Sequence, residues 1–141
     1  MEQFEICVTS ELTNLASIAE FVTQRALVAG MNEDQAFEVQ MAVDEACTNA
    51  IEHAYQGRSD GNVWICCYIE GDDFVVRVTD EGQPFDPSII SSPDTKAPLE
   101  EREIGGLGLF FMQKLMDSVV FLPGRNRGNQ VIMRKSRRTA V

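Results

Sequence analysis

Two strand-like runs follow one another directly in this chain, and their spacing restricts the possible folds more than any other feature. Residues 63–70 and 74–79 are rich in β-branched and aromatic residues, and only Gly71-Asp72-Asp73 separates them. A turn this short joins antiparallel strands, because parallel neighbours need a crossover of about a dozen residues or more. An all-parallel sheet is therefore excluded.

The remaining periodic segments complete a mixed pattern of helices and strands. Alternation over residues 3–8 predicts a first strand, and a helical period follows in two segments before residue 57. A third helical segment spans 105–116, and the runs 119–122 and 130–135 read as a closing strand pair. The predicted order is β-α-α-β-β-loop-α-β-β. This order favours an α+β two-layer sandwich, with a mixed, mostly antiparallel sheet and helices on one face.

Capping residues define the first two helices. Ser10 is expected to cap the first helix, and Gly30 to end it. Asn32 and Gln35 have the spacing of a capping box at the start of the second helix, and Gly57 is expected to end it.

Size and charge limit the classes of partner. A chain of 141 residues suits one domain, which we expect over residues 1–135. The net charge of −10 disfavours nucleic acid as a direct partner. Residues 136–141 are expected to form a solvated basic tail. No apolar run long enough for a membrane span and no signal-peptide pattern is present, so the sequence predicts a cytoplasmic protein.

The cysteines do not indicate a metal site. The chain has four cysteines and one histidine, and no Cys-x-x-Cys pair occurs. Cys66 and Cys67 are adjacent in a predicted strand and should point to opposite faces. We expect all four to be reduced and to pack as small buried hydrophobic residues.

Glu45 and Asn49 are the first candidate site residues. They are one helical turn apart and lie at the edge of the apolar stripe of the second helix. A carboxylate there can accept a proton, and an amide oxygen can bind Mg²⁺. Taken alone, the pair also fits two solvated residues on a helix flank. His53 continues the same face, and a packed structural role is the simpler interpretation for it.

Asp80 is the second candidate, at the end of the strand 74–79. The period of two places it on the apolar face of Phe74, where a carboxylate needs a partner such as an adenine amino group. Gly82 allows a tight turn and the close approach of a ligand ring, and Asp86 adds a second acid. An ordinary turn rich in Asp, Gly and Pro is the alternative.

A glycine-rich segment precedes the third helix and is the third candidate. Gly105, Gly106, Leu107, Gly108 and Leu109 would place backbone N–H groups at a helix start, which favours phosphate. The segment is neither a Walker loop nor a dinucleotide fingerprint. A flexible joint is the alternative. Each of the three signals is weak alone, but together they supply a metal ligand, an adenine contact and a phosphate cradle.

Three segments resemble motifs of one superfamily. VDEACTNAIEHAY is similar to the N-box of the GHKL ATP-binding superfamily, DEGQPFDP to its first glycine box, and GGLGLFFMQKLMD to its second. The amino-acid sequence of these motifs resembles that of the anti-sigma-factor serine/threonine kinases of bacterial partner-switching systems. Sensor histidine kinases of the superfamily need a separate phospho-accepting histidine domain, which this chain lacks.

The resemblance implies a role for each candidate. Glu45 would be the catalytic base and Asn49 the Mg²⁺ ligand, and Asp80 would bind adenine. Residues 87–104 would form the ATP lid, and Gly106 and Gly108 would flank the phosphates. The phosphate-clamping basic residue is not assigned; its candidates by position are Lys96, Arg102 and Lys114.

The same resemblance implies partners and an activity. The protein would bind a sigma factor in one state, phosphorylate a small anti-sigma-factor antagonist in the other, and form a homodimer. The alternative is a non-catalytic, ATP-gated switch that holds a regulatory partner.

Overall fold

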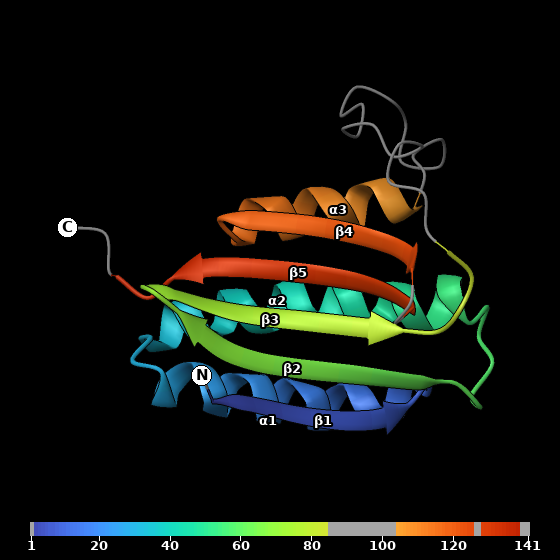
Figure 1. The fold of residues 1–141 in the computed structure, drawn as a ribbon, viewed down its shortest axis with the longest axis horizontal. Helices are drawn as coiled ribbons and strands as arrows, with labels where there is room; N and C mark the ends of the chain where they lie inside the picture. Colours follow the sequence, from blue (N-terminus) through green and yellow to red (C-terminus); the bar gives the residue numbers. More distant parts are fainter. Residues whose placement is uncertain (1, 85–103, 126–127, 139–141) are drawn as a thin grey trace.

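Five antiparallel strands form one sheet in the order β1-β2-β3-β5-β4 (Figure 1). The computed structural model describes residues 2–84, 104–125 and 128–138. The strands are β1 (Gln3–Thr9), β2 (Asn62–Glu70), β3 (Asp73–Asp80), β4 (Ser118–Arg125) and β5 (Gly128–Ser136). The helices are α1 (Leu15–Val28), α2 (Glu33–Asn49) and α3 (Ile104–Leu115). A 3₁₀ turn, Leu12–Asn14, precedes α1, and a π turn, Ala50–Ala54, extends α2.

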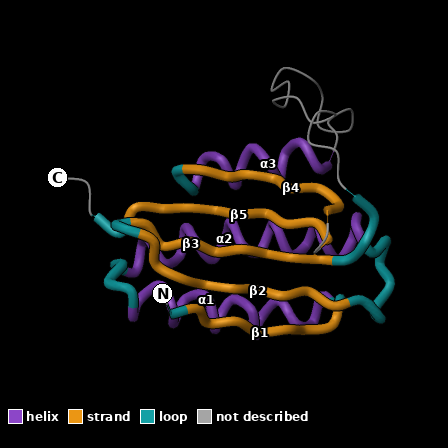
Figure 2. The backbone as a smooth tube through the Cα atoms, in the orientation of Figure 1, coloured by secondary structure: helices purple, strands orange, loops and turns teal. Residues whose placement is uncertain are grey.

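The three helices lie side by side against one face of the sheet (Figure 2). The core fills the space between these layers, with Ile18 and Val22 from α1, Val39 and Val43 from α2, and Ile65 from β2 completely or almost completely buried. The predicted α+β sandwich with helices on one face is confirmed. The sheet was predicted to be mixed and mostly antiparallel, whereas all four strand pairings among the described residues are antiparallel.

The capping box predicted for the second helix is present. The Asn32 side chain accepts a hydrogen bond from the Gln35 backbone at 2.8 Å, and the Gln35 side chain accepts one from the Asn32 backbone at 2.9 Å. The helical path ends after the π turn, and Gly57 adopts a φ of +78° that favours glycine. The start and end predicted for this helix are therefore confirmed.

Ser10 does not cap the first helix, so that prediction was wrong. The chain makes a 3₁₀ turn before α1, and Glu11 occupies the position that precedes this turn. The Ser10 side chain is buried and bonds to the loop before β2 instead. It donates to the carbonyl of Arg58 and accepts from the N–H of Gly61. The hydroxyl therefore fixes a connection between distant segments.

The described part of the basic C-terminus is only partly solvated: Arg138 is exposed as predicted, whereas Arg137 is half-buried against the fold. Arg137 donates to the carbonyl oxygens of Ala29 and Gly71 at 2.9 and 3.0 Å, so its guanidinium interacts with the C-terminal end of α1. Ion pairs of 2.7–2.8 Å join Arg134 to Glu70, Lys135 to Glu38 and Arg138 to Asp72. Each basic group has a partner far away in sequence, which local composition does not reveal.

All four cysteines are free, and three of them are buried as predicted: Cys47, Cys66 and Cys67. Cys7 is exposed, because it lies on the outward face of the edge strand β1. No helix among the described residues is long and apolar enough to cross a membrane.

Candidate functional site

The three predicted segments meet at one end of the molecule. Figure 1 shows the end of β3, the C-terminal end of α2 and the start of α3 together at the right-hand side. Antiparallel pairing brings the end of β3 to the start of β5, so a fourth segment also reaches this end. Asp80 and the α3 glycines, which are 25 or more residues apart in sequence, therefore lie at the same end of the fold.

Glu45 and Asn49 lie on α2 as predicted, one turn apart, and both are partly buried. Neither side chain has a hydrogen bond or ion pair with any of the described residues. A carboxylate and an amide held at an intermediate depth on a well-capped helix are positioned, yet free to accept a ligand. His53 is exposed on the π turn, so the prediction that it packs as a structural residue was wrong.

The π turn connects α2 to the loop after β3. The N–H of Gln83 donates to the Ala54 carbonyl at 2.8 Å. The Tyr55 hydroxyl donates to the Asn62 carbonyl at 2.6 Å and accepts from the Glu81 N–H at 2.7 Å. Burial is the main cause of the raised pKa of the Tyr55 phenol, so Tyr55 stays neutral and can donate. These bonds fix the distance between the α2 residues and Asp80.

Gly82 is required by this connection. A β-carbon at Gly82 would overlap the carbonyl group of Ala54, so any other residue would push the loop away from the helix. The predicted close approach at Gly82 is therefore present, but the approaching group in the structure is backbone of the π turn. The contact of Gly82 with an adenine ring stays a prediction.

Asp80 points to the helix-covered side of the sheet, as predicted. Phe74, Val76 and Val78 on the same face of β3 belong to the core, and Asp80 is only 7% exposed. Its Oδ1 accepts from the Gly82 N–H at 2.9 Å. Burial raises the pKa of the Asp80 carboxyl, and its hydrogen bonds offset part of that rise. No described residue donates to Oδ2, which leaves one carboxylate oxygen for a ligand.

Asn129 is the site residue that the sequence analysis missed. Its Nδ2 donates to Asp80 Oδ1 at 2.8 Å and to the carbonyl of Gln83 at 3.0 Å, and its Oδ1 accepts from the Gly124 N–H at 2.8 Å. Asn129 is directly opposite Asp80 in the β3–β5 ladder and is buried. The amide therefore supplies the internal partner that a buried carboxylate needs.

The glycine segment opens α3, as predicted: Gly105, Gly106 and Leu107 lie in the first turn, and Gly108 and Leu109 begin the second. The N–H groups of a first helical turn have no partner within the helix, so they can bind an anion. Asp86 and all of the predicted lid 87–104 except Ile104 lie outside the described residues.

Lys114 is not suited to the phosphate clamp. It lies in the last turn of α3, and its Nζ is 5.3 Å from the centroid of the Phe110 ring. At 1.5 Å per residue, the last turn is about 13 Å from the glycines of the first. Lys96 and Arg102 lie outside the described residues.

The donor set fits Mg-ATP chemically. Asp80 has an oxygen available to an amino group, and Asn49 has an amide oxygen of the kind that Mg²⁺ accepts. Among the described residues no cluster of three or more His, Cys, Asp or Glu side chains could hold a metal. One protein ligand is typical of Mg²⁺ sites that complete their shell with substrate phosphates and water.

Comparison with known proteins identifies the family. Residues 8–135 match the family described as the histidine kinase-like ATPase domain. The serine-protein kinase RsbW of Listeria monocytogenes serovar 1/2a is 36% identical over 111 residues, which cover 76% of this chain and 69% of that protein. The anti-sigma F factor of Clostridium acetobutylicum is 34% identical over 105 residues, covering 70% of this chain and 68% of that protein.

Solved structures agree on the fold. The RsbU and RsbW domains of a Mycobacterium tuberculosis protein superpose with a TM-score of 0.69 at 15% identity, covering 96% of this chain and 32% of theirs. The catalytic domain of the histidine kinase ThkA gives a TM-score of 0.57 at 17% identity, with 97% of each chain covered. The chain belongs to the histidine kinase-like ATPase domain family, and within it is similar to RsbW serine-protein kinases and anti-sigma F factors.

Proposed function

We propose that this protein is an anti-sigma factor and a serine/threonine protein kinase that uses Mg-ATP. In one state it sequesters a sigma factor, and in the other it phosphorylates a small antagonist protein. The observation that carries the proposal is the pair Glu45 and Asn49, partly buried and without partners among the described residues, at the same end of the fold as Asp80 and the start of α3. The names of the relatives, serine-protein kinase RsbW and anti-sigma F factor, support both activities.

Asp80 would hold the adenine. Its free Oδ2 would accept a hydrogen bond from the adenine amino group, and this bond would offset part of the desolvation that raises the carboxyl pKa. Asn129 occupies Oδ1 and so directs the other oxygen toward the ligand. Gly82 would lie beside the ring, on a loop fixed to the π turn.

The phosphates would lie between α2 and α3. Asn49 would hold Mg²⁺, which would supply neutralisation of the phosphate charge. The backbone N–H groups of Gly105 and Gly106 would donate to the phosphates at the positive end of α3, and Gly106 and Gly108 would flank the phosphates. Leu107, Leu109 and Asp86 would complete the contacts with the nucleotide, and residues 87–104 would act as the lid.

Glu45 would activate the acceptor. Its carboxylate takes the proton of the antagonist's serine or threonine hydroxyl, while the hydroxyl oxygen forms a bond to the γ-phosphorus and the bond to the ADP oxygen breaks. The partial exposure of Glu45 suits an acceptor that is itself a protein, because the hydroxyl must reach the carboxylate from outside.

The partners follow from this activity. A protein that controls a sigma factor would act in the cytoplasm, and its acidic net charge of −10 suits protein partners better than nucleic acid. We also propose a homodimer, which sedimentation equilibrium of the purified protein would test.

The experiment is phosphate transfer from γ-labelled Mg-ATP in a lysate of the source cells. We compare wild type, Glu45→Gln, and Asp44→Asn as the matched control. Asp44 is the neighbouring carboxylate on α2, partly buried, and burial raises its pKa. We expect wild type and Asp44→Asn to label a small protein, and Glu45→Gln to bind ATP without labelling it. If no variant labels a protein although ATP binds, the kinase proposal fails in favour of the ATP-gated binding switch.

A further inference from the structure

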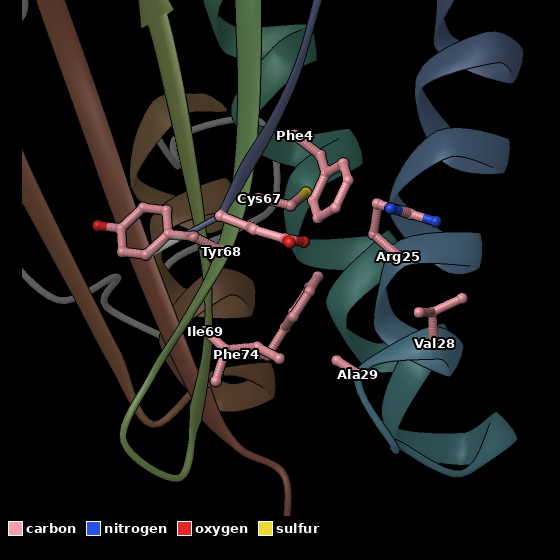
Figure 3. Close-up of a pocket in the computed structure, with 9 residues that line it drawn as sticks. Phe4, Arg25, Val28, Ala29, Cys67, Tyr68, Ile69 and Phe74 are labelled. Atoms are coloured by element: carbon pink, nitrogen blue, oxygen red, sulfur yellow. The ribbon is translucent and has the colours of Figure 1, made fainter.

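A cavity opens at the end of the molecule opposite Asp80. It has a volume of about 300 Å³ and lies between the last turn of α1 and the sheet, where β2 ends and β3 begins (Figure 3). Phe74 lines it from β3, six residues before Asp80 on the same strand. At about 3.4 Å per residue, roughly 20 Å separates the two positions, so this cavity is distinct from the proposed nucleotide site.

The floor of the cavity is apolar and belongs to the core. Cys67 and Phe74 are 1% and 2% exposed, and Ala29 is also buried. Burial raises the pKa of the Cys67 thiol to about 12, so this side chain is uncharged at neutral pH. The floor therefore offers no charge and no strong hydrogen-bonding group to a ligand, only hydrocarbon and sulfur surface.

The rim is also apolar, but it is exposed. Phe4, Val28 and Ile69 are three of the large hydrophobic residues that the fold leaves in solvent, and all three line this cavity. In Figure 3 Phe4 and Phe74 from the sheet lie opposite Val28, the last residue of α1, and Ala29, which follows it. A hydrocarbon body of matching size would remove this surface from water, which is favourable in proportion to the area covered.

One cation at the cavity has no acidic partner among the described residues. Arg25 lies over the Phe4 ring, 4.2 Å from its centroid, and makes no ion pair with any described residue. Arg134 and Arg138, at the same end of the molecule, are each paired with a carboxylate. Glu2 also lines the cavity, but it is exposed and does not pair with Arg25. The stacked guanidinium is therefore available to a carboxylate ligand.

We propose that this cavity binds a small amphipathic carboxylate, with its hydrocarbon body on Phe74 and Cys67 and its carboxylate on Arg25. The volume corresponds to roughly ten water molecules, which suits a monocarboxylate of about ten non-hydrogen atoms. The site is independent of the kinase function proposed above, because it shares no residue with it.

The test uses octanoate, with octanol and octylammonium as probes that have the same body and a different head group. Amide resonances of the purified protein are followed during titration. We expect octanoate to shift the resonances of residues 25–29, 67–69 and 74, with a Kd at least tenfold below that of octanol, and octylammonium to bind most weakly. Mg-ATP affinity is measured in parallel and should not change.

Two variants separate the contribution of the Arg25 charge to binding from that of the apolar cavity. Arg25→Gln should raise the Kd of octanoate to that of octanol, while Glu2→Gln should leave it unchanged or lower it, because Glu2 is the only acid among the described residues that line the cavity. Both positions are on the surface or partly exposed, so the fold should persist, which the amide spectrum itself reports. Octanoate that binds no better than octanol, that binds Arg25→Gln equally well, or that shifts resonances elsewhere would overturn the proposal.

Discussion

Replacement of Asp80 by asparagine separates the charge of this side chain from its shape. Asp80 Oδ1 accepts two hydrogen bonds, at 2.8 Å from Asn129 and 2.9 Å from Gly82. An asparagine with its oxygen in the same place keeps both bonds and removes the buried charge. The change therefore tests two expectations, one for stability and one for nucleotide binding.

The pH dependence of the stability effect has a defined sign. Burial raises the folded-state pKa of Asp80 above its unfolded value, so the contribution of this group to stability is complete below the unfolded pKa and is lost as pH rises through the folded pKa. At pH 7 the wild type therefore carries a desolvation cost that Asp80→Asn lacks. We expect Asp80→Asn to be no more than about 1 kcal/mol less stable than wild type at pH 7, or more stable. Its advantage should grow between acidic and neutral pH.

The same substitution should weaken nucleotide binding. The amide nitrogen would replace Oδ2 and present a donor to the donating adenine amino group. The loss of a hydrogen bond to a charged group costs about 1.5–3 kcal/mol, which is roughly a 10- to 150-fold increase in the Kd of ATP.

Urea unfolding between pH 4 and pH 8 and calorimetric titration with Mg-ATP measure the two effects. Asp80→Ala is the control. It removes both the charge and the oxygen that accepts from the Gly82 N–H, so it should lower the free energy of unfolding by about 1–3 kcal/mol. An Asp80→Asn protein that binds ATP as tightly as wild type would refute the assignment of Oδ2 to adenine. One that is as destabilised as Asp80→Ala would refute the account of the buried carboxylate.

Two further substitutions test the surroundings of Asp80. Asn129→Asp puts a second carboxylate in place of the amide that donates to Asp80 at 2.8 Å, so we expect a loss of at least about 2 kcal/mol at pH 7, partly recovered near pH 4. Urea midpoints at both pH values measure this loss, and a loss independent of pH would contradict the repulsion. Gly82→Ala adds a β-carbon where the Ala54 carbonyl lies, and we expect it to cost about 1–3 kcal/mol and to weaken ATP binding. A thermal midpoint equal to that of wild type would show that the loop moves freely.

Features that depend on residues close together in sequence were predictable. Asn32 and Gln35 form the predicted capping box because both partners lie in one helical turn. Asp80 faces the core as predicted, because the period of a strand fixes which face a residue occupies once Phe74 and Val78 define the apolar one. The spacing of Glu45 and Asn49 likewise fixed their common position on α2.

Features that depend on strand pairing were not predictable. Asn129 lies in a turn-rich segment, and only the β3–β5 register places it opposite Asp80. Ser10 and Arg137 bond to carbonyls that are 48 and 108 residues away in sequence, so local patterns indicated a helix cap and a solvated tail instead. A search for a polar residue at the start of the strand that pairs with β3 would have found Asn129, but it requires the sheet order.

The site therefore divides into a part that is already organised and a part that is not. Asp80, Asn129, Gly82 and the π turn are already joined by hydrogen bonds, so the proposed adenine position would cost little conformational entropy to form. Glu45 and Asn49 have no such bonds within the described residues, and under the proposed function their groups would acquire partners when phosphate, metal and acceptor bind. Changes at Asp80 and Asn129 should therefore act on ATP affinity and stability together. Changes at Glu45 should act mainly on phosphate transfer, because no hydrogen bond or ion pair with a described residue is lost with that side chain.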